Sequence, residues 1–362
     1  EVVVYDVPDF IGDHESIDYG DPRHPRIVQL RDKYGLDDVI GGCETEFEEI
    51  LALKRWARSQ WDYGFSKNLP DTLDGLGLLQ MAARGEKYGC GRYARLFIDA
   101  ATALGWPARR VGLHIQDCAA PRDHHIWNVG HTTSEIWSNT YRKWIVMDAN
   151  VNVHYERDGV PLNALEVHDA WLDGCAGDVE MVQDEPEFVI PDAAQVEVAR
   201  QDPTCRRDYD EEVNRLFCES FVRHRVMDYY ARIRVPTKAG MVEWVDGRCL
   251  PMFVIRFAPA APARWTSSPG DVYWTVNMVK LDAKADWDVD GAKLTVTLSH
   301  CMPFFDHYEM RVDERDWAQC EPTFEWKMVE GVHSLECRGV NRADRSCIVS
   351  RIAVAYARPP TG

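Results

Sequence analysis

The first clear helical pattern of apolar residues begins after Thr45. Thr45 and Glu48 have the spacing of a capping box, in which each side chain satisfies a backbone amide of the first turn. Apolar positions then recur at helical spacing from Phe47 to about Trp61. This pattern predicts a helix, and a leucine-rich stretch predicts a second helix over residues 72–83.

A third helical pattern is the most regular. Its apolar residues fall on one helical face at Tyr93, Leu96, Phe97, Ala100, Ala101 and Leu104. Gly105 and Pro107 end the helix, because glycine suits a C-terminal cap and proline cannot continue a helix. Strand-like runs follow over residues 108–115, 126–138 and 143–150, the last two joined by a plausible hairpin loop. Helices followed by antiparallel strands predict an α+β fold.

The flanking segments differ from this predicted core, residues 44–155. Residues 1–43 are rich in Asp, Pro and Gly and show little periodicity, so we expect an irregular N-terminal arm. Residues 156–249 carry two more helical patterns, near 162–172 and 209–233. We therefore expect a helical and loop extension behind the core.

From about residue 250 the pattern changes to short strand-like runs separated by turn residues. These runs cover residues 252–257, 271–281, 292–298, 308–312, 323–328, 333–340 and 348–356. They predict an all-β sandwich of the immunoglobulin or fibronectin kind over residues 250–362. Residues 257–269, rich in Pro and Ala, form the expected linker.

Composition narrows the classes of function. The chain has 362 residues, 45% of them hydrophobic and 28% charged, as expected for a soluble globular protein of at least two domains. No apolar run approaches the roughly 18 residues that a membrane helix needs. The net charge of −18 would repel phosphate backbones and anionic lipid, so we expect neither nucleic acid nor a membrane as partner.

The cysteines do not form a dense disulfide framework. Eleven cysteines are too few for such a scaffold in a chain of this length. Cys337 and Cys347 lie near the facing ends of two strand-like runs, which leaves a disulfide between them open. The chain begins at Glu1 rather than Met, which slightly favours a secreted or periplasmic protein over a cytoplasmic one.

Cys90 is the strongest candidate for chemistry. It stands at the head of the third helix, where backbone amides and the positive end of the helix dipole favour a thiolate. Cysteine also often serves as a small buried hydrophobe, so Cys90 alone decides nothing. His131 and Asp148 change that interpretation. His131 begins one strand-like run and Asp148 ends the next, so a hairpin brings them to the same edge of a sheet.

A thiol, an imidazole and a carboxylate in this order are the parts of a nucleophilic acyl-transfer site. The segments 88–111, 130–137 and 143–150 resemble the helix, histidine strand and aspartate strand of the transglutaminase-like superfamily core, over roughly residues 44–155. The resemblance implies a papain-like Cys-His-Asp site that works through a thioester. The chain lacks the Trp that follows the Gly-Gln-Cys signature of animal transglutaminases, which favours hydrolysis over protein cross-linking.

Other residues are candidates for binding roles. Gln60 and Trp61, at the end of the first predicted helix, are candidate oxyanion donors, although a surface glutamine and a core tryptophan would explain them equally. The candidate pocket residues are Tyr88, Tyr93, His124, His125, Glu135 and Asn150. The pair His124 and His125 could also suggest a metal, but no metal-binding spacing supports this, so we expect neither metal nor cofactor.

The sequence therefore predicts a cysteine-dependent hydrolase of amide, peptide or ester bonds with the triad Cys90, His131 and Asp148. Two alternatives stay open. The first is a carbohydrate-active enzyme, a polysaccharide lyase or glycosidase, that reuses the fold and acts on a glycan without a thiolate. The second is a catalytically inactive binding protein. The sequence does not fix the oligomeric state, and it does not name the substrate because specificity lies in loops and pocket shape.

Overall fold

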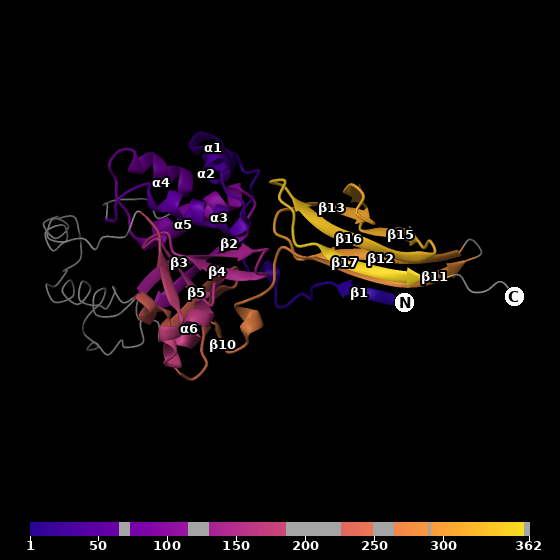
Figure 1. Ribbon diagram of the computed structural model, residues 1–362. Coiled ribbons are helices and arrows are strands. Elements are labelled where there is room, and N and C mark those ends of the chain that lie inside the picture. The colour runs from indigo at the N-terminus through magenta and orange to yellow at the C-terminus, as the bar shows by residue number, and fades with distance from the viewer. Residues whose placement is uncertain (65–72, 115–129, 186–225, 249–263, 289–290, 358–362) are drawn as a thin grey trace, which may run out of the picture. The chain divides into compact units, whose positions relative to one another are not determined.

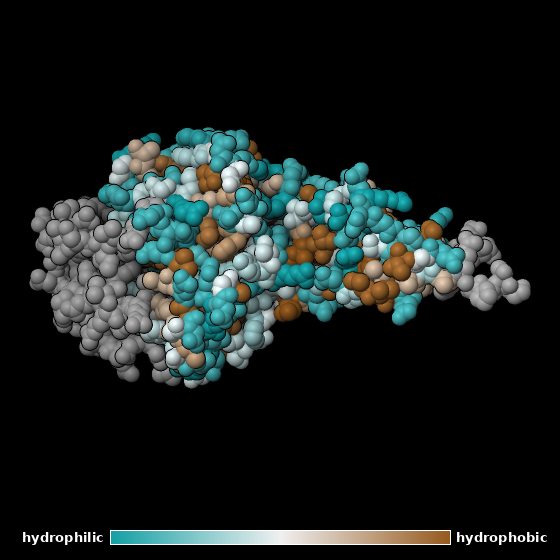
Figure 2. Space-filling view, in the orientation of Figure 1, coloured by the Kyte–Doolittle hydropathy of each residue, from teal (hydrophilic) through white to brown (hydrophobic). Residues whose placement is uncertain are grey.

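A computed structural model describes residues 1–64, 73–114, 130–185, 226–248, 264–288 and 291–357. The chain forms two compact units (Figure 1). We call Ser16–Val272 the core unit, and Glu1–Glu15 together with Tyr273–Gly362 the β unit. None of the described helices is both long enough and apolar enough to cross a membrane. Hydrophilic residues cover most of the face shown in Figure 2, in keeping with the net charge of −18.

The core unit begins with helices. They are α1 (Pro25–Tyr34), α2 (Leu36–Ile40), α3 (Glu46–Arg58), α4 (Gly75–Ala82), α5 (Cys90–Ala103) and α6 (Ala164–Leu172). The capping box of Thr45 and Glu48 opens α3 as predicted. The expected irregular arm is wrong for α1 and α2. Pro25 suits the first turn of α1, and Gly35 ends that helix with a left-handed φ of 60°.

One mixed sheet supports these helices, with strand order β10-β9-β8-β2-β3-β4. Its strands are β2 (Ala108–His114), β3 (Gly130–Ser138), β4 (Lys143–Met147), β8 (Arg232–Thr237), β9 (Gly240–Trp244) and β10 (Arg264–Thr266). All neighbours are antiparallel except β9 and β10. A smaller sheet contains β5 (Val153–Arg157), β6 (Val160–Pro161) and β7 (Glu180–Gln183).

Alternating side chains give the large sheet two packed faces. Ile145 and Met147 join the hydrophobic core with α5, whereas Val146 joins a second core with α6. Figure 1 shows α1–α5 on one side of the sheet and α6 on the other. The third predicted helix is therefore the element that packs directly on the predicted strands.

The structure divides the chain differently from the four predicted segments. β8 and β9 lie within residues 156–249 but pair into the same sheet as β2, so this segment belongs to the core unit. The predicted helix near 209–233 lies outside the described residues up to 225. Its end is a 3₁₀ helix, Val226–Ala231, followed by β8. The predicted strand 252–257 and most of the expected linker lie outside the described residues as well.

The β unit is a sandwich, as predicted. One sheet has the order β1-β17-β16-β13-β14 and the other β11-β12-β15. The strands are β1 (Val2–Asp6), β11 (Val279–Asp288), β12 (Gly291–His300), β13 (Phe305–Val312), β14 (Ala318–Cys320), β15 (Thr323–Lys327), β16 (Gly331–Asn341) and β17 (Ser350–Tyr356). Residues of both sheets, among them Val296 and Leu335, share one core. Cys337 and Cys347 are free thiols, so the disulfide left open by the sequence is not formed.

Candidate active site

Cys90 is the first residue of α5 and is partly exposed. Gly89 occupies the N-cap position without a side-chain hydrogen bond to the helix. The amides of the first turn therefore have no capping side chain, and their positive ends are available to a negative charge near the sulfur. The buried apolar face of α5, which includes Leu96 and Phe97, holds this helix end against the sheet.

His131 and Asp148 meet at the end of the β3–β4 pair. His131, in β3, lies opposite Leu113 of β2, and Asp148 follows β4 directly. His131 Nε2 lies 2.5 Å from Asp148 Oδ2, and both side chains are buried. Asp148 Oδ1 accepts hydrogen bonds from the backbone amides of Asn150 (3.0 Å) and Val151 (3.3 Å). These bonds fix the direction in which the carboxylate faces the ring.

The imidazole also reaches the thiol. Partial burial alone would raise the pKa of Cys90, but a hydrogen bond from His131 and its charge outweigh burial and lower this pKa. Burial likewise disfavours the charge on His131, yet Asp148 and Cys90 together raise the pKa of His131 to about 10. Because Nε2 faces Asp148, Nδ1 is the nitrogen left for the sulfur. These interactions favour the charged forms of both groups, the thiolate of Cys90 and the imidazolium of His131.

Three aromatic side chains form a cluster: Trp61 and the two tyrosines that flank Cys90 in the sequence, Tyr88 and Tyr93. The ring of Trp61 lies 5.0 Å from that of Tyr88 and 4.7 Å from that of Tyr93, centroid to centroid. The Tyr93 hydroxyl donates to the carbonyl of Trp61 and accepts from Arg58 Nη1 at 2.8 Å. These bonds fix the backbone at Trp61. Tyr93 therefore positions this segment rather than lining an open pocket.

The two candidate oxyanion donors differ in their surroundings. Gln60 Nε2 donates to the Trp56 carbonyl at 2.8 Å and to Ser59 Oγ at 3.2 Å, so its amide points back to its own helix. Trp61 Nε1 is buried and has no hydrogen-bond partner among the described residues. A buried donor without a partner is costly, which makes Trp61 the candidate with an available N–H.

The other predicted pocket residues fall into three groups. Tyr88 is buried, and its hydroxyl has no partner in the described part of the chain. Asn150 is also buried, and its side-chain amide lacks a partner among the same residues although its backbone supports Asp148. His124 and His125 lie outside the described residues, so their pocket role stays a prediction.

Glu135 has a structural place instead. Its Oε2 accepts from Arg109 Nη2 at 2.7 Å and from Arg109 Nε at 3.0 Å, and both side chains are fully buried. Its Oε1 accepts from the backbone amide of Ala164, the first residue of α6, at 2.8 Å. These contacts join the sheet to α6, which corrects the expectation that Glu135 lines the pocket.

Sequence reasoning missed a buried cation behind Asp148. Lys54 Nζ lies 2.8 Å from Asp184 Oδ2 and 3.3 Å from both the carbonyl of Asn152 and His154 Nδ1. Burial lowers the pKa of Lys54, and the carboxylates of Asp184 and Asp148 raise it in part. The available signal was a lysine inside the apolar stripe of α3, between Leu53 and Ala57.

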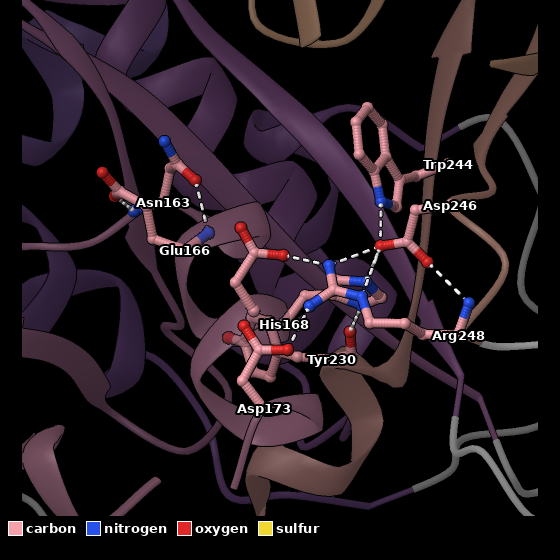
Figure 3. Close-up of polar contacts among 9 residues, drawn as sticks. Asn163, Glu166, His168, Asp173, Tyr230, Trp244, Asp246 and Arg248 are labelled. Atoms are coloured by element: carbon pink, nitrogen blue, oxygen red, sulfur yellow. Dashed lines mark hydrogen bonds and ion pairs between the residues drawn. The ribbon is translucent and has the colours of Figure 1, made fainter. Parts of the chain in front are cut away.

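A second polar cluster surrounds Arg248 (Figure 3). Ligand atoms of His168, Asp169 and Asp246 lie within 4.8 Å of one another, as metal ligands could. Arg248, however, donates to Asp246 Oδ2 at 2.8 Å (Figure 3). It also contacts Asp169. His168 Nδ1 lies 2.8 Å from the carbonyl of Tyr230. The guanidinium already supplies the positive charge that these carboxylates share, so the cluster is an ion-pair network between α6 and the segment after β9.

A helix that starts on a thiol and packs on an antiparallel sheet bearing a histidine–aspartate pair is typical of cysteine-dependent acyl-transfer enzymes and hydrolases. A comparison with family models matches part of the core unit to the transglutaminase-like superfamily. Its model matches residues 35–149, about a third of the chain. These residues form a transglutaminase-like core, as the resemblance in the sequence predicts.

Two solved structures match the chain at low sequence identity. A protein named a putative cysteine protease, from Cytophaga hutchinsonii, is 18% identical over 45% of this chain and 50% of its own, with a TM-score of 0.27. The chain thus spans about half the length of that protein. The transglutaminase of red sea bream is 9% identical over 92% of this chain and 74% of its own, with a TM-score of 0.26. No curated protein matches the chain.

Proposed function

We propose that this protein is a cysteine-dependent hydrolase of amide, peptide or ester bonds. The proposal rests on the buried contact between His131 and Asp148, and on the interaction of His131 with Cys90 that lowers the pKa of the thiol. Cys90 is the nucleophile in this scheme, and Asp148 orients the ring of His131 and stabilises its positive charge.

The reaction has two halves. The Cys90 thiolate attacks the carbonyl carbon, and the His131 imidazolium gives its proton to the leaving amine or alcohol as the bond to the carbonyl breaks. The product of this half is a thioester on Cys90 and a neutral His131. His131 then takes a proton from water, the hydroxide attacks the thioester carbon, and the thiolate leaves. When the carboxylic acid product is released, Cys90 is again a thiolate and His131 is again an imidazolium.

The negative charge on the carbonyl oxygen needs donors. The backbone amide of Cys90 at the start of α5 is one candidate, and the buried N–H of Trp61 is the other. Trp61→Phe removes this donor but keeps most of the aromatic contact with Tyr88 and Tyr93. We expect kcat for an ester or amide substrate to fall by about 100-fold, with little change in KM.

Gln60→Ala is the matched control for Trp61. Its amide already bonds the end of α3, so we expect a change in kcat of less than about threefold. A larger loss for Gln60→Ala than for Trp61→Phe would assign the oxyanion role to Gln60.

Selective labelling tests the nucleophile without a known substrate. At about pH 6, where an ordinary thiol is almost fully protonated, we expect iodoacetamide to label Cys90 well ahead of the exposed Cys175. Labelling is located by peptide mass spectrometry, with Cys90→Ala as the blank. Faster labelling of Cys175 at this pH would contradict the proposal and favour the carbohydrate-active or inactive alternative.

After labelling, a panel of peptides, amides, esters and polysaccharides identifies the substrate class. The proposal expects hydrolysis of an acyl substrate that stops when Cys90 is alkylated. Cleavage of a polysaccharide that survives alkylation would overturn it.

A further inference from the structure

Arg110 is an exposed arginine in the middle of a buried strand. Its neighbours Arg109 and Val111 are buried on the α6 side of the sheet, whereas Arg110 lies on the α5 side. Its Nη2 donates to Thr132 Oγ1 at 3.2 Å. This bond holds the guanidinium next to Thr132 of β3.

The guanidinium lies between the neighbours of both reactive side chains. Thr132 follows His131 in β3, and Gly91 follows Cys90 in α5. A Cβ placed on Gly91 would lie 4.0 Å from Arg110 Nη2. Partial desolvation lowers the pKa of Arg110, and the thiolate of Cys90 acts in the opposite direction, as expected for two groups within electrostatic range.

Among the residues that the structure describes, Arg110 lacks the carboxylate counterion that several other arginines have. Arg26, Arg31, Arg95, Arg109, Arg234 and Arg248 each pair with a carboxylate. Among the described residues no carboxylate pairs with Arg110, although the chain has 59 acidic residues. A planar guanidinium with free donors beside a nucleophile is suited to hold a carboxylate of the molecule that the nucleophile attacks.

We propose that Arg110 is a specificity residue that binds a carboxylate on the substrate, close to the carbonyl that Cys90 attacks. The substrate class is then an acyl compound that carries a carboxylate near the scissile bond. This inference rests on the proposed function, because it uses Cys90 as the nucleophile. It adds a charge preference that the triad alone does not give.

Two alkylating reagents of nearly equal size test the proposal. Iodoacetate carries a carboxylate next to the carbon that sulfur attacks, and iodoacetamide carries a neutral amide there. Second-order rate constants for modification of Cys90 are measured for both at about pH 7 and low ionic strength, where charge effects are largest. The ratio of the two rates removes any common change in the pKa of the thiol.

In Arg110→Gln we expect the ratio of iodoacetate to iodoacetamide rates to fall by about tenfold, with the iodoacetamide rate changed less than about twofold. Arg110→Lys keeps the charge but loses the planar pair of donors, so it should retain part of the preference. Arg84→Gln removes one positive charge from an exposed position and is the control for the overall field.

The outcomes separate the two claims. If wild-type Cys90 reacts with iodoacetamide no faster than Cys175 at low pH, both the function and this proposal fail. If Cys90 is reactive but Arg110→Gln leaves the ratio unchanged, or Arg84→Gln lowers it equally, the carboxylate site is overturned while the nucleophile stands.

Discussion

Replacing His131 with asparagine is expected to lower the rate of acyl transfer by about 10⁴-fold, close to the level of Cys90→Ala. The variant loses both the cation that stabilises the thiolate and the group that gives a proton to the leaving group and later takes one from water. Asparagine can still hydrogen-bond to Asp148, so the buried carboxylate keeps a partner. The measurement is kcat/KM on the substrate found by the panel.

The pH dependence of the same variant gives a second reading. In the wild type, the thiolate persists below the usual thiol range because the pKa of Cys90 is lowered, and His131 keeps its proton up to about pH 10. The imidazolium is thus the acid form that is lost as pH rises through about 10. In His131→Asn we expect alkylation of Cys90 by iodoacetamide to rise only near about pH 8.5, as for an ordinary thiol. An alkylation profile identical to that of the wild type would contradict the ion pair.

Replacing Glu135 with alanine is expected to lower the free energy of unfolding by about 3–5 kcal/mol. The change leaves the guanidinium of Arg109 buried without its counterion, and it removes the acceptor of the first amide of α6. Urea-induced unfolding followed by tryptophan fluorescence measures the loss.

Glu166 in α6, the helix that Glu135 contacts, offers a matched control. Glu166 pairs with Lys143 and completes the capping box of α6, but its side chain is 40% exposed. Glu166→Ala should cost about 1 kcal/mol. A double change, Glu135→Leu with Arg109→Met, should be less harmful than Glu135→Ala because it removes both charges together. Equal losses for Glu135→Ala and Glu166→Ala would contradict the argument from burial.

The sequence predicts the centre of the core unit well because its signals are local. The apolar stripe of α5 and the Gly105 that follows the helix are close together in the sequence. The hairpin that joins β3 to β4 also spans only a few residues. The contact of His131 with Asp148 follows from that hairpin alone. The position of Cys90 beside them needed the packing of α5 on β3, which the resemblance to the superfamily supplied.

Other elements depend on contacts that no local pattern reveals. α1 and α2 have few buried residues of their own, and Leu30 and Leu36 are buried because other helices of the core unit pack against α1 and α2. β8 carries Arg232, Arg234 and Pro236, and it becomes a strand by pairing with β2 and β9. In the same way, the sequence alone suggests that Glu135 is a pocket residue. The structure shows instead that it pairs with Arg109, 26 positions earlier.

The pairing of β1 with β17 has a consequence for synthesis of the protein. β1 holds residues 2–6, yet among the described residues it pairs with residues 351–354 of β17. A ribosome delivers β1 more than 300 residues before β17, so β1 must wait for its partner strand while the core unit between them emerges. Val2, Val3 and Tyr5 stay solvent-exposed even after pairing. During that interval the nascent chain carries an apolar, unpaired strand, and we expect chaperones to cover it.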